Sequence, residues 1–106
     1  MPLSIQGRPD RGQALATLRA AFDAGFDFVD TADVYCLDDA DLGHNERLIA
    51  EALAGHPRRH EVVVATKGGL LRPEGRWERD ARPAQLLAAC DRSLTALGLD
   101  QIALYQ

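Results

Sequence analysis

The sequence lacks the features that mark several classes of protein. Its apolar stretches fall well short of the roughly 20 residues that a membrane-spanning helix needs, and the first eight residues hold no apolar core of a secretory signal. It has no basic run, and its formal net charge of −4 gives little support to binding of nucleic acid or of anionic membranes. With only two cysteines, Cys36 and Cys90, it fits a reduced cytoplasmic protein better than a disulfide scaffold.

A phosphate-binding Gly-x-Gly-x-x-Gly pattern is also missing after every predicted strand. Its absence argues against a Rossmann dinucleotide fold. There is no low-complexity tract, and the apolar fraction of 46% is ordinary for a globular protein. With 106 residues, the chain is long enough for one domain and no more.

Helical and extended patterns alternate along the chain. Apolar residues recur at helical spacing in residues 11–24, 45–54 and 83–97, and a glycine follows each of these segments. Short apolar runs typical of strands occupy residues 26–30, 62–67 and 101–105. This alternation predicts an α/β fold with a parallel sheet, either part of a (β/α) barrel or a small open sheet. The second run is apolar on both faces, which predicts a strand covered by helices on both sides.

Two longer segments, residues 31–41 and 68–80, are predicted to be loops. The first contains three acids, Asp38, Asp39 and Asp41. A metal site is conceivable there, but a solvated acidic loop is the favoured interpretation, because no further ligands are nearby. In the second loop, Trp77 either lines a substrate pocket or forms a hydrophobic plug.

The cysteines and histidines carry weaker predictions. Cys36 is either a reactive thiol or, as we favour, an ordinary loop cysteine. Cys90 lies on the apolar stripe of the third helix and should be in the core. His44 and His60 are predicted at the surface, and His56 as a cation beside a helix C-terminus.

The apolar run that begins at Phe26 ends abruptly in an acid, Asp30. Side chains alternate along a strand, so this acid shares a face with Phe28, where an unpaired carboxylate is costly. The obvious partner is Lys67, which ends the second run, and Tyr35 follows five residues after the acid. Each residue alone has an ordinary interpretation as a cap, a surface aromatic or a solvated strand end. Together at neighbouring strand ends they predict a proton-transfer site.

Four motifs follow one another along the chain. They are Asp30-Thr31-Ala32-Asp33-Val34-Tyr35, Gly43-His44-Asn45-Glu46-Arg47-Leu48-Ile49, Ala65-Thr66-Lys67, and Leu97-Gly98-Leu99-Asp100 with Leu104-Tyr105-Gln106. In this order and spacing they resemble the aldo-keto reductases over nearly the whole chain. The resemblance implies a partial (β/α)8 TIM barrel in which three parallel strands alternate with three helices. Residues 1–106 would then be a single segment of that barrel, lacking the first strand and everything after the fourth.

The resemblance also implies a chemistry, the NADPH-dependent reduction of a small aldehyde or ketone to an alcohol. By motif, the family's catalytic Asp, Tyr and Lys match Asp30, Tyr35 and Lys67, and the acid also lies near the nicotinamide ribose. The family's His lies two residues beyond Gln106. In that scheme the lysine ammonium favours the phenolate, which makes the tyrosine a general acid, and the aspartate keeps the lysine charged. No metal is implied.

Three functional hypotheses remain at this point. The first is a segment of an NADPH-dependent carbonyl reductase. The second is a catalytically inactive or degenerate reductase that acts, if at all, through association of its open sheet edges. The third is another barrel enzyme whose Asp30 and Lys67 serve a Schiff-base or metal reaction, which would leave the spacing to Tyr35 without a role.

Overall fold

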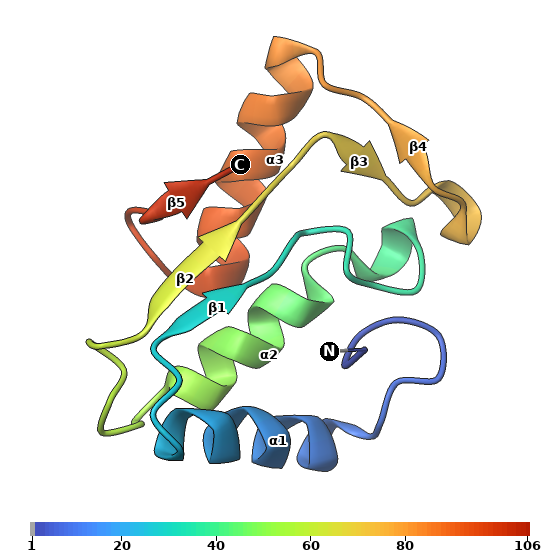
Figure 1. Cartoon of the computed structure of the whole chain (residues 1–106). Coiled ribbons are helices and arrows are strands. Elements are labelled where there is room, and N and C mark those ends of the chain that lie inside the picture. Colours follow the sequence, from blue (N-terminus) through green and yellow to red (C-terminus); the bar gives the residue numbers. More distant parts are fainter. Residues whose placement is uncertain (1) are drawn as a thin grey trace.

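The computed structural model describes residues 2–106, in which three α-helices pack against a small parallel sheet (Figure 1). The helices are α1 (Arg11–Asp23), α2 (His44–Leu53) and α3 (Pro83–Leu97). The sheet holds β1 (Phe28–Asp30), β2 (Val63–Thr66) and β5 (Leu104–Tyr105), in the order β1-β2-β5 with both pairs parallel. The predicted α/β fold of three parallel strands and three helices is confirmed, and within the described residues the strands do not close into a barrel.

The helices begin and end within one residue of their predicted bounds, whereas the strands are shorter than predicted. The first strand begins at Phe28 instead of residue 26, and the last is only Leu104–Tyr105. Helix ends are set locally: the Asp10 side chain accepts a hydrogen bond from the Gln13 N–H at 3.0 Å and so caps α1. A strand ends where its neighbour stops pairing with it, which the apolar run alone does not specify.

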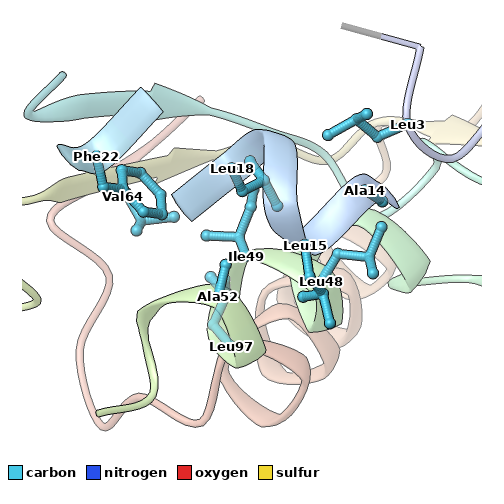
Figure 2. Close-up of a cluster of buried hydrophobic side chains, with 10 residues drawn as sticks. All are labelled: Leu3, Ala14, Leu15, Leu18, Phe22, Leu48, Ile49, Ala52, Val64 and Leu97. Atoms are coloured by element: carbon cyan, nitrogen blue, oxygen red, sulfur yellow. The ribbon is translucent and has the colours of Figure 1, made fainter. Parts of the chain in front are cut away.

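One hydrophobic core lies between the helices and one face of the sheet (Figure 2). Helices α1 and α2 contribute most of it, and Val64 is the buried member from the central strand. The cluster consists of Leu3, Ala14, Leu15, Leu18, Phe22, Leu48, Ile49, Ala52, Val64 and Leu97. The spacing of the α1 residues is the helical stripe seen in the sequence, which is why this part of the fold follows from the periodicity.

The opposite face of the sheet is open except at Ala65, which is buried. Phe28, Val63 and Leu104 share that face by their register and are 53%, 40% and 44% exposed, and Phe26 is 65% exposed. The predicted burial of the first strand is therefore wrong, as is the predicted covering of the second strand on both faces. The reason is that the core helices cover one face only, and no other element of residues 2–106 covers the other.

The buried face of α3 also differs from the predicted stripe. Ala89, Ser93 and Leu97 are buried, whereas Leu87 is 70% exposed and Cys90 is only half-buried, so the core placement of Cys90 is wrong. None of the helices in residues 2–106 combines the length and apolar character that crossing a membrane requires.

The segment predicted as one loop between β2 and α3 contains a short antiparallel hairpin. Its strands are β3 (Leu70–Leu71) and β4 (Glu78–Arg79), and a 3₁₀ turn, η2 (Pro73–Gly75), joins them. Strands of two residues leave too little alternation to be recognised in the sequence. The acidic loop likewise holds a 3₁₀ turn, η1 (Asp39–Asp41).

We expect the 106-residue chain to self-associate through the open face of its sheet. Exposed apolar patches and unpaired strand edges both favour association. Sedimentation velocity should show oligomers, and a hydrophobic dye should bind. The variant Phe28→Ser should reduce both signals, whereas Leu87→Ser, which removes an even more exposed apolar side chain from α3, should not. A monomer that binds no dye would contradict this prediction.

Candidate active site

Asp30 and Lys67 meet at the carboxyl ends of two neighbouring strands. The register of β1 and β2 pairs Asp30 with Ala65, so Lys67 lies just past the end of the central strand. Its Nζ donates to Asp30 Oδ2 at 2.5 Å and to the Thr31 carbonyl at 3.0 Å. The lysine and aspartate side chains keep 30% and 44% of their surface exposed. The two residues thus form an ion pair at an accessible edge of the sheet.

Tyr35 lies on the loop after β1, beside this ion pair. The Lys67 ammonium is 5.0 Å from the centroid of the tyrosine ring. Partial burial disfavours the charged amine, but the neighbouring Asp30 carboxylate and Tyr35 phenol outweigh it and raise the pKa of Lys67 above its ordinary value. Lys67 is therefore an ammonium at neutral pH. An acid, an amine and a phenol from three separate segments are brought together.

Gln106 is a further member of this group that the sequence analysis did not single out. Its Nε2 donates to Asp30 Oδ1 at 3.2 Å, so both oxygens of the carboxylate accept a hydrogen bond. Its backbone is held by Thr66 and Gly68, at 2.9 Å and 3.1 Å. Its position at the end of the third predicted strand was the signal available in the sequence, because parallel strands end at the same edge of a sheet.

An open cavity of about 410 Å³ adjoins the ion pair. It is lined by Pro2, Ser4, Ile5, Asp30, Tyr35, Asn45 and Trp77. Trp77 is 56% exposed and forms part of the wall, which agrees with the first of its two predicted placements. The volume lies in the range of small-molecule sites, about 300–1,000 Å³.

A buried hydrogen-bond network fixes the floor of the cavity. The Thr31 hydroxyl donates to Asn45 Oδ1 at 2.8 Å, and Asn45 Nδ2 donates to Ser4 Oγ at 2.9 Å. Thr31 directly follows Asp30, and Asn45 lies in the first turn of α2. The network therefore ties the end of β1 to that helix and to the N-terminal loop.

The three histidines lie outside this group. His44, predicted at the surface, is half-buried, and its Nδ1 is 2.8 Å from Ser4 Oγ. Burial lowers the pKa of His44 below its ordinary value. His56 packs after α2 with its Nε2 2.8 Å from Asp23 Oδ1, at the last residue of α1. His60 is exposed, as predicted.

The structure distinguishes between the alternative interpretations of Cys36 and of the acidic loop. Cys36 is completely buried, and burial raises the pKa of its thiol to about 11, so it is not the reactive thiolate of the alternative. In the acidic loop, Asp41 forms an ion pair with Arg8 at 2.5 Å. The prediction that the acids of this loop are freely solvated is therefore wrong for Asp41. No group of three His, Cys, Asp or Glu side chains in residues 2–106 is arranged to hold a metal ion.

Two buried acids lie on the helix side of the sheet, and the sequence analysis missed them. Asp33 is 1% exposed and Glu46 is fully buried. Glu46 accepts a hydrogen bond from the Thr66 hydroxyl at 2.6 Å, and Arg92 lies 3.6 Å from Asp33. Burial, together with the charge of Glu46, raises the pKa of Asp33 from 3.8 to about 6. Asp33 does not line the cavity beside Tyr35.

Comparison with known proteins shows that the chain is similar to aldo-keto reductases. Residues 1–106 match the model of the Aldo/keto reductase family. The chain is 36% identical over 99 residues to the uncharacterized oxidoreductase YqkF of Bacillus subtilis (strain 168), covering 92% of this chain and 30% of that protein. It is 42% identical over 95 residues to the 6-dehydroglucose reductase of Novosphingobium aromaticivorans, covering 88% and 30%. A crystal structure of a putative aldo-keto reductase from Pseudomonas aeruginosa superposes with a TM-score of 0.81 at 27% identity, covering 98% and 38%.

The coverage is uneven between the chain and these proteins. The chain spans about 30% of the length of the curated relatives that it matches. The superposition likewise uses nearly all of this chain but a minority of the solved structure. The predicted resemblance, to one segment of a longer barrel, is therefore confirmed.

Proposed function

This chain belongs to the aldo/keto reductase family, and from that premise we propose that its candidate site serves an oxidoreductase that reduces aldehydes or ketones to alcohols with NADPH. In this proposal Asp30, Tyr35 and Lys67 deliver the proton. The observation that carries it is the position of one ammonium, 2.5 Å from the Asp30 carboxylate and 5.0 Å from the centre of the Tyr35 ring, at the edge of an open cavity.

Reduction of a carbonyl group needs a hydride at carbon and a proton at oxygen. When bound, NADPH supplies the hydride. Tyr35 donates its hydroxyl proton to the carbonyl oxygen as the general acid, and a phenolate remains on the protein. The ammonium of Lys67 stabilises that phenolate by its charge, because it lies beside the ring. The tyrosine recovers its proton from solvent after the alcohol leaves.

Asp30 has two roles in this proposal. Its carboxylate keeps Lys67 charged and aimed, and Gln106 holds the second carboxylate oxygen. The side chain is also 44% exposed beside the cavity, so its oxygens are available to a hydroxyl donor. A ribose hydroxyl of the nicotinamide half of NADPH fits that chemistry, and we assign Asp30 to hold it.

The substrate in this proposal is a small carbonyl compound. The cavity presents apolar surface from Ile5 and Trp77 and polar side chains from Ser4 and Asn45, which suits a small molecule with both apolar and polar parts. The 42% identical relative is named as a 6-dehydroglucose reductase. We therefore propose a sugar-derived carbonyl compound as the first substrate to test.

A second proposal concerns the 106-residue chain by itself, which would be catalytically inactive and act, if at all, through association. Two observations favour it. The chain spans about 30% of its curated relatives, and within residues 2–106 the face of the sheet that holds Phe28 and Val63 has no cover. A reaction that must exclude water is poorly served by such an open site.

One experiment separates the two proposals. A chimera would carry residues 1–106 in place of the matched segment of the Novosphingobium aromaticivorans reductase, and NADPH absorbance would be followed with 6-dehydroglucose. We expect turnover by the chimera and none by the 106-residue chain alone. A folded chimera that binds NADPH but reduces nothing would reject the first proposal, whereas turnover by the chain alone would reject the second.

A further inference from the structure

Arg72 is a buried cation in the segment between β3 and η2. The residue is 8% exposed, yet no carboxylate of residues 2–106 lies within ion-pair distance of its guanidinium. Arginine is almost never buried unless its charge is compensated. In this chain the compensation comes from backbone carbonyl oxygens, and these belong to two different loops.

Four carbonyl oxygens accept hydrogen bonds from the Arg72 guanidinium. Nη1 donates to the Cys36 oxygen at 2.9 Å and more weakly to the Val34 oxygen at 3.5 Å. Nη2 donates to the oxygens of Leu37 and Gly75, both at 3.0 Å. One planar head therefore bridges the loop after β1 and the turn of the hairpin.

Three of these four oxygens flank Tyr35 on both sides. Among the described residues, the carbonyl oxygens of Cys36 and Leu37 accept no backbone N–H, so the arginine is their donor. The two loops are also in direct contact. A side chain added at Gly75 would lie 3.2 Å from the Leu37 oxygen, and Gly75 has a φ of +82°. The Tyr35 loop is thus held against the hairpin by one residue at close range.

The same guanidinium supports the wall of the cavity. It lies 4.0 Å from the centroid of the Trp77 ring, and Trp77 and Tyr35 line one cavity. A flat, five-donor head can stack on an indole and satisfy several carbonyls at once. A lysine ammonium, with three donors and no flat face, cannot do both.

We propose that Arg72 is a positioning residue, which holds the Tyr35 loop and the Trp77 wall in the arrangement that keeps the Tyr35 ring beside Lys67. The inference rests on the proposed role of Tyr35 for its catalytic meaning. Its structural content, that loss of the guanidinium moves the Tyr35 ring away from Lys67, stands separately and is tested without turnover.

Lys67 is the only lysine of the chain, so a lysine label reports on this residue alone. A chain grown with 13C-labelled lysine gives one set of side-chain NMR signals, and the Tyr35 ring 5.0 Å from Nζ shifts the neighbouring ε-methylene protons. The variant Tyr35→Leu defines the shift without the ring. We expect Arg72→Gln, which adds no second lysine, to move the signal at least half of the way to that value. Arg76→Gln, which changes an exposed arginine of the same hairpin, should leave it in place.

Each outcome decides the proposal. An Arg72→Gln signal that coincides with the wild-type signal would overturn it. If this variant does not fold, Arg72→Met, which keeps the length of the side chain without its donors, is measured in the same way. If both unfold while Arg76→Gln remains folded, the guanidinium supports the fold as a whole, and the specific role is rejected.

The chimera supplies the functional readout. There, Arg72→Lys should lower kcat by up to about 10²-fold, as expected for small displacements of a reacting group, with a smaller change in KM. Failure of the wild-type chimera to turn over would reject the proposed function but would leave the NMR comparison intact. The two failures are therefore distinguishable.

Discussion

Exchanging Tyr35 for phenylalanine is expected to lower carbonyl reduction by the chimera about 10²–10⁴-fold, the usual contribution of a positioned general acid. The change removes the only proton that the proposed mechanism transfers to the substrate oxygen. It keeps the aromatic ring whose centroid lies 5.0 Å from the Lys67 ammonium, so the ion pair with Asp30 should persist. The fall should appear in kcat, measured from NADPH absorbance, with little change in KM.

The chain offers a matched control in its other tyrosine. Tyr105 lies on β5, and its buried hydroxyl has no hydrogen-bond partner among the described residues. Burial raises the pKa of Tyr105 to about 12, so this phenol is a poor proton donor. The variant Tyr105→Phe should keep activity within a few-fold of the unmodified chimera. If both substitutions lower carbonyl reduction by the chimera equally, or if neither lowers it, Tyr35 is excluded as the proton donor.

The second large effect concerns stability and its dependence on pH. We expect Asp33→Asn to change the free energy of unfolding differently at different pH. Its effect should be about 3 kcal/mol more stabilising at pH 8 than at pH 4, since one pKa unit corresponds to about 1.4 kcal/mol. Asp33 is 1% exposed, and burial together with Glu46 raises the pKa of Asp33 from 3.8 to about 6. Asparagine has nearly the same shape and does not ionise.

The direction follows from where the proton binds more tightly. The folded state holds the Asp33 proton up to about pH 6, whereas the unfolded chain releases it near pH 3.8. Protonation therefore stabilises the folded state fully below about pH 4, and this stabilisation is lost as the pH rises through 6. Above that range the wild-type chain carries a buried carboxylate whose nearest cation, Arg92, is 3.6 Å away and 42% exposed. Such a pair compensates little of the burial cost.

Urea unfolding at several pH values between 4 and 8 measures this effect. The quantity of interest is the difference in free energy of unfolding between the variant and the wild type at each pH, because titrating groups that do not interact with Asp33 cancel in it. Asp91→Asn is the control, since Asp91 is exposed next to Arg92 and its replacement changes the net charge equally. A difference for Asp33→Asn that is the same at pH 4 and pH 8 would contradict the buried-acid interpretation.

The candidate site was largely predictable because its residues lie at the ends of sequence patterns. Asp30 and Lys67 each terminate an apolar run, and parallel strands place such ends side by side at one edge of a sheet. Tyr35 lies within reach on the loop that follows. Gln106 was open to the same argument and was overlooked, because an amide after a strand carries no chemistry of its own until it contacts a carboxylate.

Other features had no local signal in the sequence. Asp33 and Glu46 look like ordinary surface acids, and they are buried only because α3 and the sheet close over them. Arg72 looks like an exposed residue of a polar loop. Its burial arises where the hairpin packs against the loop that carries Tyr35. Each depends on contacts between segments more than ten residues apart.

The sequence by itself determined the succession of helices and strands, the caps of the helices and the acid, phenol and amine at the strand ends. These follow from hydrogen bonds and apolar periodicity within a few residues of one chain segment. Only the tertiary structure decided that one face of the sheet stays open, with Phe28 at 53% exposure. It also decided that the Arg72 guanidinium, which has no carboxylate partner in residues 2–106, joins two loops. The physical reason is that burial is a property of what lies opposite a side chain, and that neighbour is supplied by a distant part of the chain.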